Sequence, residues 1–296
     1  MLIALLTRGH ALLVGVPGLA KTLLVSSLAE ALDLSFGRVQ FTPDLLPADI
    51  TGTDVLQEEE EANGGVRRRV RFLAGPIFHN LVLADEINRT PPKTQAALLE
   101  AMQEKQVTLE GNSAPLPRPF MVLATQNPIE QEGTYPLPDA QLDRFLFKIR
   151  IDYPSEADEI ALTRQVTRTR TGADLDVDTV ATLLQPEAVL ALQQWAAHVV
   201  LDERVIAYAV AIVRASRTAP GFANGAGSRG PLALVRGARA RALMAGRGFA
   251  TPDDVKAVAL PALRHRVTPA AEAEIEGLAA DDLLRALLER VPAPRL

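Results

Sequence analysis

One segment near the N-terminus constrains the fold more than any other. The apolar run Ala11–Val14 leads into a short glycine-containing loop, and apolar residues recur with helical spacing from Lys21 onwards. A strand, such a loop and a helix in this order predict a phosphate-binding loop, because the loop amides and the helix N-terminus surround an anion. The loop and the first helical residues read Gly15-Val16-Pro17-Gly18-Leu19-Ala20-Lys21-Thr22.

The polar members of this loop have expected roles. Lys21 would place a positive charge on the β and γ phosphates of ATP, and the Thr22 hydroxyl would be a ligand of Mg2+. Ala20 stands where the standard pattern has glycine, and its methyl group is small enough to keep the loop. An ordinary strand-to-helix turn is the alternative interpretation of such a relaxed match. The residues expected to contact the nucleotide are Gly15, Pro17, Gly18, Leu19, Ala20, Lys21 and Thr22.

A second motif strengthens this interpretation. Four apolar residues from Leu81 form a buried strand that ends in the adjacent carboxylates Asp85 and Glu86. Ligands bind at the carboxyl ends of strands in such sheets. We therefore expect Asp85 to hold Mg2+ through water and Glu86 to activate the attacking water as general base. A helix cap or a surface charge is the alternative for an acidic pair at a strand end.

Three further residues are candidates for completing the site. Asn127 follows the next strand, where its amide could orient water against the γ phosphate, although an Asn-Pro turn is the alternative. Arg144 is the candidate for an arginine finger that stabilises charge in the transition state. Arg229, at the start of a later helix, is the candidate for a sensor of the nucleotide in its own chain. Either arginine could instead form a surface salt bridge.

Strand and helix signals alternate up to about residue 152, which predicts a mostly parallel sheet covered on both faces. From residue 153 only helical patterns remain, so residues 1–152 are expected to form an α/β domain and residues 153–296 a smaller all-α domain. The predicted strands are Ala11–Val14, Gly37–Phe41, Leu81–Leu83 and Phe120–Ala124; the predicted helices are Lys21–Leu32, Thr94–Glu104, Glu156–Arg170, Pro186–Val199, Glu203–Arg217, Leu232–Ala245 and Thr251–Leu260.

Two segments of the first domain have the pattern of hairpins. Asp54–Phe72 contains the turn residues Asn63-Gly64-Gly65 between an acidic and a basic arm, and Val107–Pro117 contains Gly111-Asn112. Two interpretations stay open for both: surface ribbons with solvated charges, or contacts at a pore or with a partner.

Composition narrows the classes of function. The net charge of -5 argues against a protein that grips nucleic acid, since such proteins display a dominant basic face. No run approaches the ~18 apolar residues of a membrane span. The absence of cysteine fits the reducing cytoplasm, which is the expected location. Trp195 is predicted to pack in the core. The four histidines have no metal-ligand spacing and are predicted to be structural: His10, His79, His198 and His265.

The chain resembles the MoxR-type AAA+ ATPases, in the branch that includes the motor subunits of magnesium chelatase. The resemblance implies a P-loop AAA+ core with a helical lid, ATP and Mg2+ as ligands, and a ring of commonly six subunits with Arg144 acting on a neighbour's nucleotide. It also implies chaperone-like work on partners that bear a von Willebrand factor A domain, including the insertion of metal cofactors. The matching residues are Gly15–Thr22 (Walker A), Asp85–Arg89 (Walker B), Ala124–Pro128, Gly133–Pro138, Leu142–Phe145, Gly225–Leu234, Thr251–Val255 and Arg264–Arg266.

The chain departs from this family pattern at its start. Nine residues precede His10, whereas the family has a further helix and a Gly-Gln-containing segment that help to enclose adenine. We therefore expect weaker or less base-selective nucleotide binding. The rival functions are a nucleic-acid translocase with Arg67–Arg69 at its pore, and a nucleotide-dependent scaffold that does not hydrolyse ATP.

Overall fold

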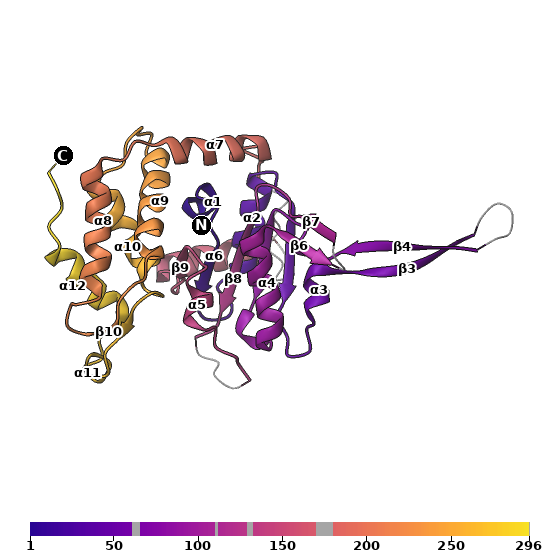
Figure 1. The fold of residues 1–296 in the computed structure, drawn as a ribbon, viewed down its shortest axis with the longest axis horizontal. Coiled ribbons are helices and arrows are strands. Elements are labelled where there is room, and N and C mark those ends of the chain that lie inside the picture. The colour runs from indigo at the N-terminus through magenta and orange to yellow at the C-terminus, as the bar shows by residue number, and fades with distance from the viewer. Residues whose placement is uncertain (61–65, 110–111, 129–132, 170–179, 296) are drawn as a thin grey trace.

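The chain has the predicted α/β core followed by a helical lid. The computed structural model describes residues 1–60, 66–109, 112–128, 133–169 and 180–295. Its central sheet has five strands, all parallel, in the order β2-β5-β8-β1-β9 (Figure 1). The carboxyl ends of all five strands therefore lie at one edge of the sheet and the amino ends at the other. The strands are β1 (Ala11–Val14), β2 (Phe36–Gln40), β5 (Leu81–Asp85), β8 (Met121–Gln126) and β9 (Phe147–Arg150).

Alternation along the strands explains why the sheet is covered on both faces. On β5, Leu81 and Leu83 belong to the apolar cluster that includes residues of α2 (Lys21–Ala31). Val82 and Ala84 belong to the cluster that includes residues of α4 (Pro92–Glu104). Successive side chains of a strand point to opposite faces, so a strand buried on both faces needs a continuous apolar run. This is the physical reason why the run from Leu81 was informative.

Both predicted hairpins are present. The first consists of β3 (Gly52–Glu60) and β4 (Val66–Ala74), which follow α3 (Pro47–Thr51) and project from the body as a long arm (Figure 1). The second consists of β6 (Gln106–Leu109) and β7 (Asn112–Pro115). The predicted turn residues at 63–65 and 111 lie outside the described part of the chain, as do the side chains of Arg67 and Arg69.

The C-terminal half is helical, as predicted, apart from the two-stranded ribbon β10–β11. Each predicted helix is present, with ends that differ by a few residues from the expected ones. The predicted helix start at Thr251 is confirmed, and the start is capped: the backbone N–H of Thr251 donates to Asp254 Oδ2 over 2.9 Å. The elements are α6 (Glu156–Thr169), α7 (Pro186–His198), α8 (Glu203–Ser216), β10 (Phe222–Asn224), α9 (Arg229–Met244), α10 (Pro252–Leu263), β11 (Thr268–Pro269), α11 (Ala271–Ile275) and α12 (Ala280–Arg290).

The lid packs against the core at the β9 side. The amide of Gln193 on α7 donates to the carbonyl of Leu5 in α1 (Leu2–Leu6) over 2.7 Å. One apolar cluster runs from the α2 face of the sheet into the lid, where Phe147 of β9 lies against Gly237 of α9. Two short elements complete the core: a 3-10 turn at Ile87–Arg89 and α5 (Asp139–Leu142).

Two predictions about individual segments were wrong. The strand β9 was missed, because its four residues end shortly before the Tyr153-Pro154 break and carry two basic side chains. Trp195 is not a core residue, since 62% of it is exposed on α7. The prediction for two histidines is confirmed: His10 and His265 are buried and hydrogen-bonded to backbone groups. Among the helices described, none is long and apolar enough to cross a membrane.

Candidate functional site

The phosphate-loop segment connects β1 to α2 at the carboxyl edge of the sheet. Gly15 leaves no room for a side chain, because a Cβ there would lie 2.5 Å from the carbonyl oxygen of Ile151. Gly18 and Ala20 have φ of 82° and 49°, in the left-handed region. At Ala20 this conformation has a steric cost of roughly 1–2 kcal/mol. The loop backbone is therefore tightly curved.

Lys21 lies over this curve. Its Nζ donates to the carbonyl oxygens of Gly15, over 2.6 Å, and of Val16, over 3.1 Å. Partial burial lowers the pKa of the Lys21 ammonium, and the nearby carboxylates of Asp85 and Glu86 oppose that shift. The ammonium thus lies in a semi-enclosed position between the loop and two acidic residues.

The two acidic residues at the end of β5 are oriented by Thr125 at the end of β8. The Thr125 hydroxyl donates to Asp85 Oδ1 over 2.7 Å and accepts the backbone N–H of Glu86 over 2.8 Å. Thr125 is 1% exposed, so both hydrogen bonds are shielded from water. Glu86 itself has a φ of 57°, which turns the chain sharply after the strand. Asn127 is buried directly after β8, at the same edge of the sheet.

Strand β2 contributes two residues that the sequence analysis missed. Arg38 Nη2 lies 2.7 Å from Asp85 Oδ2, and the Gln40 amide donates to Glu86 Oε2 over 3.1 Å. Arg89 Nε lies 3.1 Å from the same oxygen of Glu86. Arg38 and Gln40 are two residues apart and so share one face of β2. The two-residue spacing is present in the sequence, but the sequence does not indicate that β2 pairs with β5.

The donor groups at this edge are suitable for Mg2+. The Thr22 hydroxyl follows Lys21 on α2, and the Asp85 carboxylate lies at the end of β5, which β8 separates from β1. Both are hard oxygen ligands of the kind that Mg2+ binds, usually together with several waters. Both oxygens of Asp85 already have partners, Thr125 and Arg38.

A cavity of about 390 Å3 adjoins the loop on the β9 side. Gly15 and Val16 line it from the loop, Ile151 and Tyr153 from the segment after β9, and Asp281 from α12 of the lid. Asp281 is buried and lies 3.0 Å from Nε of Arg264, which joins α12 to the end of α10. The lid therefore forms one wall of the space beside the loop.

The two candidate arginines lie elsewhere. Arg144 Nη1 donates to the carbonyl of Leu99 over 2.8 Å, and Arg229 Nη1 lies 3.6 Å from Asp143. Both line a cavity of about 340 Å3 together with His10, which directly precedes β1. This is the amino edge of the sheet, the length of β1 away from the phosphate loop. Arg229 therefore lies away from the phosphate loop of its own chain.

The chain is similar to known proteins over nearly its whole length. Residues 10–147 match the model of the ATPase family associated with various cellular activities (AAA), and residues 214–287 match an AAA lid domain. The uncharacterized Bacillus subtilis protein YeaC is 42% identical over 99% of this chain and 88% of its own length. The chaperone MoxR1 of Mycobacterium tuberculosis is 40% identical over 100% of this chain and 77% of its own.

One more distant relative and one solved structure are also similar to the chain. The magnesium-chelatase 38 kDa subunit of Acidiphilium rubrum is 29% identical over 72% of this chain and 60% of its own length. A crystal structure of a proposed ATPase from Cytophaga hutchinsonii aligns with a TM-score of 0.87 at 41% identity, over 99% of this chain and 88% of that one. The chain belongs to the MoxR family of AAA ATPases.

Proposed function

We propose that the chain hydrolyses ATP with Mg2+ in a ring of subunits, six by the family resemblance, and uses the hydrolysis to remodel or mature partner proteins. One observation carries the first part of this proposal: Lys21, Asp85 and Glu86 converge at one sheet edge with buried Thr125 orienting both acids. The homologue named chaperone MoxR1 supports the second part.

The residues at the sheet edge have distinct roles in this proposal. The phosphates are surrounded by backbone groups of Gly15, Pro17, Gly18, Leu19 and Ala20. The Lys21 ammonium turns from the loop carbonyls and donates hydrogen bonds to the phosphate oxygens. Thr22 and Asp85 hold Mg2+, which neutralises charge on the phosphates when bound. Glu86 accepts a proton from the attacking water, and Asn127 orients that water. The base of the nucleotide lies in the cavity beside Tyr153 and Asp281.

The ring would complete the site. Arg144 and Arg229 share one cavity at the amino edge of the sheet, so we propose that both act on the nucleotide of the adjacent subunit. Arginines that contact the γ phosphate stabilise charge in the transition state and couple hydrolysis to assembly. A partner that bears a von Willebrand factor A domain is proposed by family resemblance.

The decisive experiment is the Glu86→Gln variant with Glu100→Gln as matched control, because Glu100 is exposed on α4 and makes the same change of charge. We expect Glu86→Gln to keep nucleotide binding and to lose 100-fold or more of the phosphate release, on the order expected for a general base. Unchanged turnover in Glu86→Gln would sink the assignment. Absence of phosphate release from the unsubstituted chain would favour a scaffold that does not hydrolyse ATP.

A further inference from the structure

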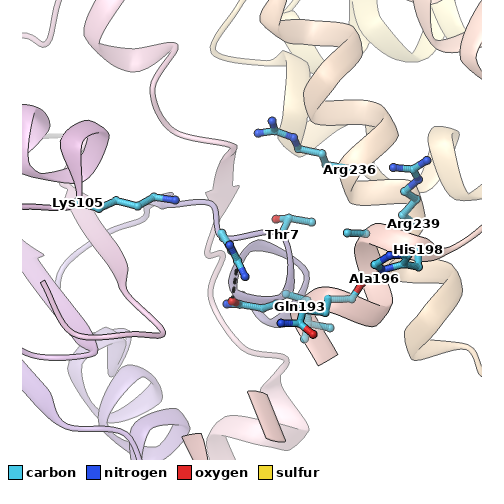
Figure 2. A pocket seen from close by; sticks show the side chains of 11 residues that line it. Thr7, Lys105, Gln193, Ala196, His198, Arg236 and Arg239 are labelled. Carbon is cyan, nitrogen blue, oxygen red and sulfur yellow. Dashed lines mark hydrogen bonds between the residues drawn. The ribbon is translucent and has the colours of Figure 1, made fainter. Parts of the chain in front are cut away.

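A third cavity, of about 390 Å3, lies between the core and the lid. Figure 2 shows Lys105, at the end of α4, and Arg236, on α9, approaching the cavity from different sides. We call it the basic cavity. Its positively charged or titratable lining residues are Arg8, Lys105, His198, Arg236 and Arg239.

In the part of the chain that the structure describes, four of these cations form no ion pair with an acidic residue. Among the described residues, Arg8, Lys105, Arg236 and Arg239 take part in none of the salt bridges. Arg8 Nε donates to the neutral Gln193 over 3.1 Å, and Nε of Arg239 is buried without a hydrogen-bond partner. A chain with a net charge of -5 has enough carboxylates to pair with them, so their concentration here without carboxylates is informative.

Other cations surround Lys105. Burial lowers the pKa of its ammonium, and the charges of Arg8, Arg118 and Arg236 lower that pKa further. Keeping like charges together costs free energy that an anion between them would remove. The cluster therefore favours a ligand with more than one negative charge.

The basic cavity continues into the cavity that Arg144 and Arg229 line. Arg8, Lys105 and Arg236 belong to the walls of both. Asp143, an acidic residue in the cavity lined by Arg144 and Arg229, already forms ion pairs with Arg266 at 2.7 Å and with Arg229 at 3.6 Å. Arg8, Lys105 and Arg236 therefore lie where the two cavities join, and no acidic residue in the described ranges forms an ion pair with them.

We propose that Arg8, Lys105 and Arg236 form a second phosphate site, distinct from the phosphate loop, that binds a di- or triphosphate group. Two guanidinium groups and one ammonium suit the tetrahedral oxygens of phosphates, which accept paired and charge-assisted hydrogen bonds. The phosphates have two sources: polyphosphate free in solution, or the nucleotide held by an adjacent copy of the chain. In the second case the inference rests on the ring proposed above.

The test uses the full chain with Lys21→Ala, which removes the ammonium of the phosphate loop. Inorganic tripolyphosphate is titrated calorimetrically into this chain and into the same chain carrying Arg8→Ala, Lys105→Ala and Arg236→Ala. We expect the triple substitution to weaken binding at least about tenfold, corresponding to the loss of charge-assisted hydrogen bonds. The matched control carries Lys93→Ala, Lys256→Ala and Arg290→Ala, which remove three exposed cations outside the cavity. It should bind as the Lys21→Ala chain does.

A second measurement separates the two sources. ATP-dependent association is followed by sedimentation in chains with intact Lys21, with and without the cavity substitutions. Loss of association in the cavity variant alone, with no tripolyphosphate binding to the Lys21→Ala chain, assigns the site to a neighbour's nucleotide. Equal binding and equal association in cavity and control variants overturn the proposal. Arg236→Glu is the folding check, because Arg236 is exposed and takes part in no salt bridge among the described residues. Nucleotide binding by the intact loop, measured separately, tests the proposed function.

Discussion

The guanidinium of Arg38 lies 2.7 Å from the carboxylate of Asp85, the residue proposed to hold Mg2+. The contact joins neighbouring strands, β2 and β5, at the edge where the phosphate loop lies. A cation that neutralises Asp85 competes with Mg2+ for the same oxygen. The pair therefore links metal binding to the position of the Arg38 side chain, which is 48% exposed and free to move into water.

Arg38→Ala tests this competition. Exposed ion pairs contribute up to about 1 kcal/mol, so removing the arginine should lower the Mg2+ concentration for half-maximal ATPase activity by about two- to fivefold. A magnesium titration of activity measures the effect, and Arg214→Ala, an exposed arginine on α8, is the control. A higher Mg2+ requirement in Arg38→Ala would mean that Arg38 supports the metal site.

Thr125→Val tests the orientation of the two acidic residues. Valine keeps the shape but leaves Asp85 Oδ1 and the Glu86 N–H without their shared partner. We expect a loss of about 1–3 kcal/mol in the free energy of unfolding and a lower kcat. Thr125→Ser retains the hydroxyl and should recover most of the activity. Denaturant unfolding and phosphate release measure the two effects, and a serine variant as poor as the valine variant would contradict the role of the hydroxyl.

Gly15→Ala tests the packing of the loop against β9. Its Cβ would lie 2.5 Å from the Ile151 carbonyl oxygen, so the loop must shift. Overpacking of this kind costs about 1–3 kcal/mol, and we expect nucleotide affinity to fall as well. Gly227→Ala is the control, since a Cβ there meets no atom within 4 Å. Fluorescent nucleotide binding and thermal unfolding decide the matter; equal behaviour of the two variants would refute the packing argument.

His10 predicts a dependence of stability on pH. Its Nδ1 accepts the N–H of Val122 over 2.9 Å, so the proton resides on Nε2, which lies 3.3 Å from the carbonyl of Met102. Burial lowers the pKa of His10 from 6.5 to about 4. Between these values the unfolded state binds more protons, so the free energy of unfolding rises with pH. About 3 kcal/mol of stability should be lost as pH falls from 7 to below 4.

The measurement is denaturant unfolding at a series of pH values. In His10→Gln this part of the acid dependence should disappear, because glutamine has no proton to gain. His198→Gln, which changes an exposed histidine, should keep it. An unchanged pH dependence in His10→Gln would show that other groups cause the acid sensitivity.

Arg144→Ala and Arg229→Ala test action between subunits. Each should keep nucleotide binding and lose turnover, because both lie at the edge opposite the phosphate loop of their own chain. Mixing either variant with Lys21→Ala should restore activity, since a mixed interface combines an intact loop with intact arginines. Steady-state phosphate release of the mixtures measures this, and no recovery at any ratio would argue against action on a neighbour.

Elements whose signals are local could be predicted from the sequence alone. A loop that must curve needs glycine at Gly15, and a strand buried on both faces needs the apolar run before Asp85, so each left a pattern of adjacent residues. The same holds for the helix start at Thr251 and for the two hairpins. Strand β9 escaped because it has only four residues and ends shortly before the Tyr153-Pro154 break.

Contacts between residues far apart in the sequence could not be predicted in this way. Arg38 and Gln40 reach Asp85 and Glu86 because β2 pairs with β5. The order of strands in a sheet cannot be inferred from one sequence. Arg144 and Arg229 are 85 positions apart in the sequence and yet share one cavity at the amino edge. The position of Arg229 beside Arg144 depends on packing between the lid and the core. That packing is built from many weak apolar contacts rather than from any one motif.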